Sequence, residues 1–581
     1  MLAKKQITQR HALSDLNDPS IHPLLNRLYA NRGIKSPAEL DYSLKNLPYP
    51  GLLSGMPVAC EILYEALIAQ ANIVIVGDYD VDGATSTALV IQALHAFGFK
   101  HVAYFIPDRM TFGYGLSPEV VSLIQKFQPD LIVTVDNGIS SIEGVQLANE
   151  LGISVIVTDH HLPAHELPQA DAIVNPNLPG DRFPAKKIAG VGVAFYSMLG
   201  LRAHLRKLSW FDEQNLTEPS MVDFLDLVAL GTIADVVPFD YTNRLLVSQG
   251  MLRIRHSKCG EGIKALASIS QCELEQITTA DIAFKIAPRI NAAGRLDDMS
   301  IGVECLLTDD PGRAIDLANQ LNVINEQRKT EELKSNQQAA IRITADLADE
   351  LQPEQQSSIC LHGENWHPGI VGLIASRLKD RFNLPTIIFA DDDNNLKGSA
   401  RSINGIHIRD VLATMDSMQP DLIKSFGGHS MAAGLSLEKD DFLEFKALFD
   451  KQIRKHHADK LVTATIQTDG RLNGGDFNLQ TCQLIQFSGP WGPEFDAPLF
   501  NNYFEVMDCS IIGKTENHLR FGLRLKENDQ IIRAVAFNVD RYFDMSNLSM
   551  QRINAVFKLD INHYNSSHLL QVIIVYFTVE S

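Results

Sequence analysis

The chain has 581 residues with 51 Lys or Arg against 70 Asp or Glu, which gives a formal net charge of −19. Hydrophobic residues make up 45% and charged residues 21%, a balance that excludes a largely disordered chain and implies two to four domains at this length. The acidic balance argues mildly against nucleic acid, although a local basic groove or bound metal ions can override it. No apolar run approaches the ~18–20 residues that cross a bilayer, so we expect no membrane association and a cytoplasmic location.

The first ~40 residues are polar and predict an N-terminal arm. Beyond residue 70, runs of β-branched residues alternate with segments of helical character, the pattern of a parallel sheet that is covered on both faces. Strands are expected at 71–76, 101–106, 131–135 and 153–157, and helices at 84–97, 118–127 and 142–151. In such sheets the active site lies beyond the carboxyl ends of the strands.

Three further regions follow along the chain. Residues 311–349 are polar, helix-rich and low in Gly and Pro, which predicts a long connecting helix. A smaller α/β unit follows, and short alternating stretches after about residue 461 predict a small β-barrel. The expected division is therefore 1–40, 41–305, 306–350, 351–460 and 461–581.

Acidic residues and histidines gather where the predicted strands end. The clusters are Asp78, Asp80 and Asp82 after the first strand, Asp136 after the third, Asp159, His160 and His161 after the fourth, and Asp235 near a later helix end. Carboxylates gathered at one sheet edge raise one another's pKa unless cations hold them. Oxygen ligands with an imidazole suit two Mn²⁺ or Mg²⁺ ions, which would activate a water and stabilise a leaving phosphate oxygen.

Simpler interpretations of these motifs are less favoured. The stretch 78–83 matches the opening of an EF-hand loop, but the twelfth position is Leu89 rather than Glu and the loop follows a strand. A lone Asp-x-Asp is often a solvated turn, and a lone His-His pair is more often structural. The segment 190–195 resembles a dinucleotide loop without its final Gly, so helix packing explains it better.

These motifs resemble those of the DHH phosphoesterase superfamily. The matching stretches are Asp78 to Gly83, Asp136-Asn137-Gly138, Asp159-His160-His161 and Gly231 to Asp235, and residues 427–434 (GGHSMAAG) resemble the signature of the associated DHHA1 domain. The form of the first motif, the stretch Pro288 to Arg295 and the C-terminal β region favour the RecJ family within this superfamily.

The resemblance implies roles for individual residues. Asp78, Asp80, Asp82, Asp136, His160 and Asp235 would hold two metal ions, with Asp136 as the bridging ligand and part of the catalytic set. Some relatives have a His where this chain has Val74, so which two of the three first aspartates contact metal stays open. His161 would face the scissile phosphate, and Asp159 would orient its neighbours.

The resemblance also implies a substrate-binding set in the second α/β unit. Gly428 and His429 lie in its glycine signature, while Ser399 and Arg401 resemble a 5′-phosphate pocket, assisted by Arg109, Arg289 and Arg377. The alternatives are a glycine-rich packing turn and, for any one arginine, a surface ion pair.

The C-terminal region resembles the OB-fold of the family. Stacking faces would come from Phe487, Trp491, Phe495 and Phe500, and phosphate contacts from Lys514, Arg520, Arg524, Lys526 and Arg533. For any single aromatic residue of this set, a place in the barrel core is the stronger expectation.

The function implied is a metal-dependent exonuclease that degrades single-stranded DNA from its 5′ end, in DNA repair and recombination. Partners implied by the resemblance are a single-strand-binding protein and a helicase, and the chain is expected to be a monomer. Three alternatives remain: a phosphodiesterase for short oligonucleotides or cyclic dinucleotides, a manganese pyrophosphatase, and an inactive scaffold relative.

Overall fold

The chain forms two compact units. The structure, a computed structural model, describes residues 5–108, 112, 114–164, 166–331, 357–363, 366, 368–392, 395–403, 405–428, 430–457, 465–513, 518–527, 529–537, 550–562 and 569–580. Unit 1 comprises Met1–Arg10 and Gln327–Thr468, and unit 2 comprises His11–Glu326 and Asp469–Ser581. The five-part division expected from the sequence stays a prediction at the level of its boundaries.

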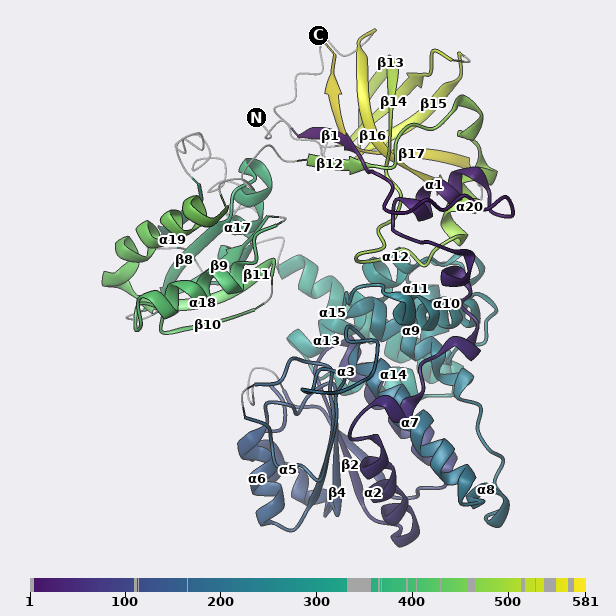
Figure 1. Cartoon of the computed structure of the whole chain (residues 1–581), viewed down its shortest axis with the longest axis vertical. Helices are drawn as coiled ribbons and strands as arrows, with labels where there is room; N and C mark the ends of the chain where they lie inside the picture. The colour runs from purple at the N-terminus through teal and green to yellow at the C-terminus, as the bar shows by residue number, and fades with distance from the viewer. Residues whose placement is uncertain are drawn as a thin grey trace. The chain divides into compact units, whose positions relative to one another are not determined.

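Unit 2 contains the predicted parallel sheet, with strand order β3–β2–β4–β5–β6 (Figure 1). Its strands are β2 (Ile73–Gly77), β3 (Val102–Phe105), β4 (Leu131–Val135), β5 (Ser154–Thr158) and β6 (Ala172–Val174). Ile73 and Ile75 pack in the core with α2 (Met56–Ala69), α3 (Val81–Phe97) and α7 (Gly190–Lys207). Val74 and Val76 pack on the other face with α5 (Pro118–Ile124) and α6 (Ile142–Glu150). Both faces are therefore covered, as the continuous apolar runs predict.

A helical layer follows the sheet in unit 2. It consists of α8 (Trp210–Glu213), α9 (Leu225–Ala234), α10 (Tyr241–Arg255), α11 (Glu261–Ile269), α12 (Thr279–Asp281), α13 (Ala287–Leu296), α14 (Ser300–Leu307) and α15 (Pro311–Glu331). Helix α3 contacts α7, α9 and α14, so the helix that starts at the acidic loop is packed on several sides. The first part of the helix predicted at 311–349 corresponds to α15, and residues 332–349 lie outside the described residues.

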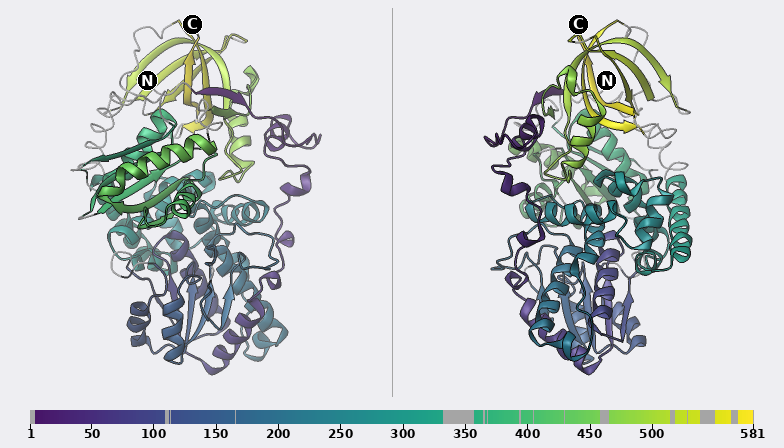
Figure 2. Two further views of the ribbon diagram at one scale, coloured as in Figure 1. Left: turned by 60° about the vertical axis from the view of Figure 1, so that its left-hand side comes forward. Right: turned by 90° about the vertical axis from the view of Figure 1, so that its right-hand side faces the viewer.

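The C-terminal part of unit 2 is a closed five-stranded barrel, which confirms the OB-like prediction (Figure 2). Its order is β13–β14–β15–β17–β16, with β13 (Phe500–Ile512), β14 (His518–Arg524), β15 (Ile531–Ala536), β16 (Arg552–Asn562) and β17 (Leu569–Val579). Phe504, Phe521 and Phe557 are fully buried and fill its interior. Helix α20 (Leu479–Phe487) precedes the barrel.

The N-terminal segment contributes a helix to the core of unit 2. Helix α1 (Pro23–Ala30) lies in unit 2, where Arg32 and Asp469 form an ion pair of 3.0 Å whose two side chains are each 1% exposed. Asn31 Nδ2 also donates to Asp469 Oδ1 at 2.9 Å. A buried charge pair with further hydrogen bonds is costly to break, because either charge alone would be left unpaired.

Unit 1 is the predicted second α/β unit. Its sheet has the order β10–β11–β9–β8–β7, from β7 (Ile359–Gly363), β8 (Thr386–Asp392), β9 (Asn395–Arg401), β10 (Ser425–Gly428) and β11 (Ala432–Glu438). Helix α17 (Pro368–Phe382) packs on one face, and α18 (Ile408–Met418) and α19 (Phe442–His457) pack on the other. A second, two-stranded parallel sheet pairs β1 (Gln6–Gln9) with β12 (Thr465–Thr468).

Within the described residues, no single helix is both long and apolar enough to span a membrane. One bent pair, Leu44–Leu52 with Met56–Ala69, reaches that length and composition when its two parts are taken together.

Candidate active site

The acidic clusters meet at the carboxyl edge of the parallel sheet. Asp78 follows β2, Asp136 follows β4 and Asp159 follows β5, and these three strands are neighbours in the sheet. Asp235 is the C-terminal cap of α9, a helix that packs against α3. The structure therefore brings together four segments that are spread along the sequence from Asp78 to Asp235.

The side chains of this edge converge as ligands around a cation would. His160 Nε2 lies 3.2 Å from Asp136 Oδ1, 3.6 Å from Asp235 Oδ2 and 4.0 Å from Asp82 Oδ2. Asp136 Oδ1 and Asp235 Oδ2 are buried, yet neither accepts a hydrogen bond from any described residue. Buried carboxylate oxygens are normally satisfied, so this arrangement fits hard divalent cations.

The described residues contain three groups of possible metal ligands, and within each group the ligand atoms lie within 4.8 Å of one another. They are Asp78–Asp80–Asp136, Asp82–His160–Asp235 and Asp136–His160–His161. Asp136 belongs to two of these groups, which is the position that a bridging ligand takes. All six predicted ligands fall within the three groups.

A strained turn presents Asp136 to the site. Its φ of 61° is in the left-handed region, where a residue other than glycine costs ~1–3 kcal/mol. Asn137 offsets this cost, because its Nδ2 donates to the carbonyls of Val76 and Val135 at 2.9 Å each. Thr134 Oγ1 donates to the Asn137 carbonyl at 2.7 Å, which closes the turn.

The sequence analysis missed the role of the N-terminus of α7. The main-chain N–H groups of Gly190 and Val191 donate to the two carboxylate oxygens of Asp82 at 2.6 and 2.8 Å. A Cβ on Gly190 would lie 2.4 Å from Asp136 Oδ1, so only glycine fits beside both aspartates. The segment 190–195 does begin a packed helix, but its first residues also hold the acidic site.

Helix α13 supports the first aspartate loop in a similar way. Asn291 Oδ1 accepts the N–H of Val81 at 3.1 Å, and a Cβ on Gly294 would lie 1.8 Å from the Tyr79 carbonyl oxygen. Arg289 on the same helix turns elsewhere, because its Nε donates to Asn322 Oδ1 at 3.0 Å. The stretch 288–295 thus supports the aspartate loop through Asn291 and Gly294, and substrate binding by Arg289 stays a prediction.

Burial and mutual repulsion make these carboxylates hard to ionise without a cation. Burial, and then the charge of Asp80, raise the pKa of Asp78 to about 7, and the same two causes raise the pKa of Asp82 to about 7. Burial and neighbouring carboxylates also raise the pKa of Asp136 and of Asp235 well above its ordinary value. A divalent cation would remove this penalty by replacing the protons.

Asp159 has a different environment and a different role. Its carboxylate is fully buried and accepts the main-chain N–H groups of Ile139, His160 and His161 at 3.0, 2.7 and 3.0 Å. Burial alone would raise the pKa of Asp159, but the hydrogen bonds and charge of His161 outweigh it and lower the pKa. Asp159 therefore stays ionised and orients its neighbours, as expected of a residue behind the ligands.

In unit 1, Ser399 and Arg401 lie side by side on the face of β9 that α17 partly covers. Arg401 donates to Ser399 Oγ at 2.9 Å, and a Cβ on Gly372 of α17 would lie 3.0 Å from the Arg401 guanidinium. No carboxylate pairs with Arg401 in the described part of the chain, and burial lowers its pKa. A half-buried guanidinium without an anion is a candidate site for a phosphate.

The glycine signature lies in the neighbouring strands. Gly434 of β11 stands opposite Ser399 of β9 and Gly427 of β10, and a Cβ at either glycine would meet nothing within 4 Å. These glycines therefore have no packing role within the described residues and leave room for close approach of a ligand. Gly428 has a φ of 137°. Arg377 lies on α17, and burial lowers its pKa.

Several predicted site residues are not placed by the structure. Arg109, His429 and Lys514 lie outside the described residues, so their roles stay predictions.

The barrel leaves some of its predicted basic residues exposed and pairs others. Arg524 pairs with Glu505 at 2.6 Å and Arg533 with Asp508 at 3.2 Å, so these two arginines are partly neutralised. Arg520 and Lys526 are exposed, with no ion pair among the described residues. These two remain the best candidates for phosphate contacts.

The predicted stacking residues mostly serve packing. Phe495 and Phe500 are 1% and 0% exposed. Trp491 stacks on Phe495 with ring centroids 5.3 Å apart, and its indole N–H donates to the Ile485 carbonyl at 2.8 Å. Phe487 is 41% exposed, but the guanidinium of Arg255 lies 4.9 Å above its ring. The expectation that single aromatics of this set belong to the core is met by Phe495 and Phe500.

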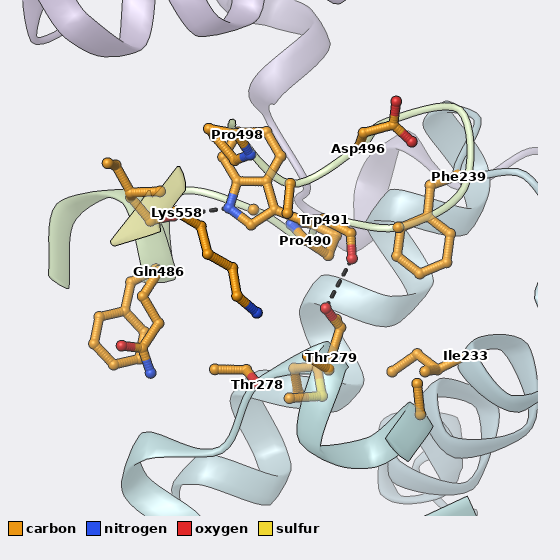
Figure 3. A pocket seen from close by; sticks show the side chains of 18 of the residues that line it. Ile233, Phe239, Thr278, Thr279, Gln486, Pro490, Trp491, Asp496, Pro498 and Lys558 are labelled. Carbon is orange, nitrogen blue, oxygen red and sulfur yellow. Dashed lines mark hydrogen bonds between the residues drawn. The ribbon is translucent and has the colours of Figure 1, made fainter. Parts of the chain in front are cut away.

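Trp491 also lines a cavity of about 540 Å³ inside unit 2 (Figure 3). The Lys558 side chain extends into it, and Ile233 on α9 forms part of another wall. Thr279 Oγ1 donates to the Trp491 carbonyl at 2.7 Å across this space. Ile233, Ala234 and Val236 line the cavity, whereas Asp235 between them belongs to the metal-ligand groups.

Comparison with known proteins matches this architecture segment by segment. Residues 72–232 match the N-terminal domain of the DHH family, residues 355–455 match the DHHA1 domain, and residues 468–576 match the RecJ OB domain. The fold and the acidic edge therefore define a DHH phosphoesterase.

Close relatives show which family of DHH phosphoesterases the chain belongs to. The chain is 44% identical to the single-stranded-DNA-specific exonuclease RecJ of Salmonella typhimurium, covering 99% of both chains. It is 45% identical to the protein of that name from Escherichia coli, covering 95% of both. The crystal structure of RecJ with Mn²⁺ from Thermus thermophilus matches with a TM-score of 0.74 at 29% identity, over 97% of this chain and 76% of that one. The chain belongs to the RecJ family.

The raised carboxylate pKa values predict an unusual pH dependence of stability for the metal-free protein. A carboxyl group whose pKa is ~3.9 unfolded and about 7 folded contributes stability that is full below pH ~3.9 and is lost as the pH rises through about 7. We therefore expect the midpoint of urea denaturation, measured in the presence of a chelator, to decrease as the pH is raised from 5 to 8. This decrease should be larger in the parent protein than in Asp136→Asn. Asparagine removes one charge and tolerates the left-handed turn.

The control for this comparison is Asp212→Asn, at an exposed position of α8, which should keep the slope of the parent. Equal slopes for the parent and Asp136→Asn would show that the carboxylates do not repel one another in the folded state.

Proposed function

We propose that this protein is a metal-dependent exonuclease that degrades single-stranded DNA from its 5′ end by hydrolysing phosphodiester bonds. The observation that carries the proposal is the convergence of Asp136, His160 and Asp235 with buried carboxylate oxygens that accept no hydrogen bond from the described residues. The names of the relatives supply the substrate class, since several are single-stranded-DNA-specific exonucleases.

The donor set fits two divalent cations, Mn²⁺ or Mg²⁺. Relatives from Thermus thermophilus have been crystallised with each of these ions. Asp78, Asp80, Asp82, Asp136, His160 and Asp235 would hold the pair, with Asp136 between the two groups of ligands. When bound, such a pair supplies an acidified water as nucleophile and charge neutralisation for the departing oxygen.

The remaining residues of this edge, Asp159 and His161, would orient one another and bind the substrate phosphate. His161 is held by Asp159, with 2.7 Å between Nδ1 and Oδ1, and its side chain is 38% exposed. The hydrogen bond and charge of Asp159 raise the pKa of His161, although burial opposes the shift. An imidazole held in this way at the open edge is suited to contact a phosphate oxygen at the reacting centre.

Residues of unit 1 would set the 5′-to-3′ direction of degradation. Ser399 and Arg401 offer a hydroxyl and a guanidinium that pairs with no carboxylate of the described residues, on one face of β9 beside the open glycines of β10 and β11. A terminal 5′ phosphate carries more negative charge than an internal phosphodiester, so this pair would favour the strand end. We place the activity in DNA repair and recombination, in the cytoplasm, on the strength of the substrate class.

Partners beyond DNA rest on the family resemblance. We propose that the chain is a monomer that acts with a single-strand-binding protein and a helicase. Light scattering of the purified protein tests the first point, since a stable dimer would contradict it.

Asp136→Asn should abolish hydrolysis while leaving the fold intact. It removes the charge of the bridging ligand, so both cations lose a ligand, and we expect at least a ~10³-fold loss of turnover. The assay is release of nucleotides from a 5′-phosphorylated single strand at saturating Mn²⁺, with Asp212→Asn as the matched surface control. Near-normal turnover by Asp136→Asn would contradict the two-metal assignment.

Arg401→Ala should weaken use of 5′-phosphorylated strands much more than use of 5′-hydroxyl strands. A lost charged hydrogen bond costs ~1.5–3 kcal/mol, or roughly 10- to 100-fold in KM for the phosphorylated end. Arg409→Ala is the matched control, because Arg409 is exposed on α18 across the sheet. Degradation that starts at the 3′ end of a labelled strand would refute the polarity assignment altogether.

Arg520→Ala and Lys526→Ala should weaken capture of long single strands without affecting cleavage of short oligonucleotides. Each lost phosphate contact should lower the slope of log affinity against log salt by ~0.7. Deleting the whole barrel is a poorer test, since its core is continuous with that of the sheet and helices of unit 2.

Arg533→Ala serves as the control for these two variants, because Arg533 is already paired with Asp508. Unchanged affinity and salt slope in both variants would mean that the barrel serves stability or protein contacts instead.

A further inference from the structure

Tyr114 contacts the acidic edge from outside the motifs assigned to it. Its hydroxyl oxygen lies 3.0 Å from the Asp136 carbonyl oxygen and 3.1 Å from His161 Nδ1. Its ring meets the His161 imidazole edge to face, with centroids 5.6 Å apart and planes at 77°. The side chain thus touches the turn of the bridging ligand and the second histidine of the motif at once.

The direction of these hydrogen bonds follows from the number of protons. The Asp136 carbonyl can only accept, so the single hydroxyl proton of Tyr114 is donated to it. The hydroxyl then offers a lone pair to His161 Nδ1, which must carry a proton. His161 Nδ1 also lies 2.7 Å from Asp159 Oδ1, so the same proton faces that carboxylate oxygen. Nδ1 is therefore held from two sides, and Nε2 is the nitrogen left for the open edge.

Tyr114 is 43% exposed, but a second aromatic residue supports its ring. Its ring packs edge to face on Tyr79, with centroids 6.3 Å apart. The Tyr79 carbonyl in turn lies against Gly294 of α13, where no Cβ would fit. On the other side, Asn175 Nδ2 donates to the His161 carbonyl at 2.9 Å, which fixes the main chain that carries the imidazole.

Two contacts on one nitrogen achieve what Asp159 alone does not. A hydrogen bond along the Nδ1–H direction leaves the ring free to tilt about that bond, whereas a second oxygen and a packed ring edge restrict the tilt. We infer that Tyr114 is a positioning residue, which holds the His161 imidazole so that Nε2 faces the scissile phosphate. This inference rests on the proposed function, since it assigns a role within that reaction.

The variant that isolates the hydroxyl is Tyr114→Phe, which keeps the ring and removes both hydrogen bonds. With a 5′-phosphorylated single strand at saturating Mn²⁺, kcat should fall about tenfold while KM stays within about twofold, as expected for a lost orienting hydrogen bond. The Mn²⁺ dissociation constant, measured by calorimetry, should be unchanged. Tyr104→Phe is the matched control, because Tyr104 donates to Glu304 at 2.7 Å in the same unit, away from the metal-ligand groups.

A double-mutant cycle tests whether Tyr114 acts through His161. On a His161→Ala background, measured in single turnover with excess protein, Tyr114→Phe should change the rate by less than about twofold. Tyr114→Ala on the parent background should cost more than Tyr114→Phe, since it also removes the packed ring edge. Melting temperatures of all variants check that each is folded.

Several outcomes would overturn the inference. An unchanged kcat in Tyr114→Phe refutes it. A raised KM with unchanged kcat would make Tyr114 a contact of the strand instead, and a weaker Mn²⁺ affinity, with activity restored at higher Mn²⁺, would make it a support of the metal turn. A parent protein that is inactive on single-stranded DNA, by contrast, would contradict the proposed function itself.

Discussion

Mutual repulsion among buried carboxylates is the constraint around which unit 2 is built. Asp78, Asp82 and Asp136 are 6%, 1% and 2% exposed, and each has a pKa raised first by burial and then by neighbouring carboxylates, with Asp80 acting on all three. Such a cluster is tolerated only if the surrounding fold prevents it from relaxing apart. Much of the local structure does this, since Asn137 holds one turn to two strands and the first residues of α7 hold Asp82 from behind.

The supporting contacts come from elements far apart in the sequence, which explains the size of the unit. Gly190 approaches Asp136 from α7, Asn291 reaches the loop of Val81 from α13, and Asp235 arrives at the end of α9. The helical layer therefore acts as a scaffold for a site whose ligands repel one another, and divalent cations complete the balance of charge.

The sequence predicts the sheet well because its signal is local. Continuous β-branched runs locate four strands, and three clusters of acids and histidines follow directly from the ends of such strands. Helix α3 begins at Val81, three residues before the expected start, because Asp80 caps it by accepting the N–H of Gly83. The predicted convergence of ligands needed only the rule that parallel strands end at one edge.

What the sequence could not predict depends on distant partners. The sequence does not show that Arg289 donates to Asn322, or that Arg524 and Arg533 pair with Glu505 and Asp508 across the barrel. Tyr114 carries no signal of its own, since its role depends on oxygens and nitrogens of two other loops. A single sequence shows which side chains can donate or accept, but their partners are fixed only when the chain folds.

The acidic net charge of the chain is compatible with binding to a polyanion such as DNA. A chain with a net charge of −19 can serve a polyanion only where its cations are left without internal partners. Arg401 of β9 has hydrogen-bond partners but no carboxylate partner among the described residues, and the glycines of β10 and β11 leave the neighbouring surface open. Its core clusters are separate from those of unit 2, so a change at Arg401 and a change at Asp136 act on different packed cores. The proposed recognition of the strand end at Arg401 and the proposed hydrolysis at Asp136 should therefore be separable by mutation, since neither set of side chains supports the packing of the other.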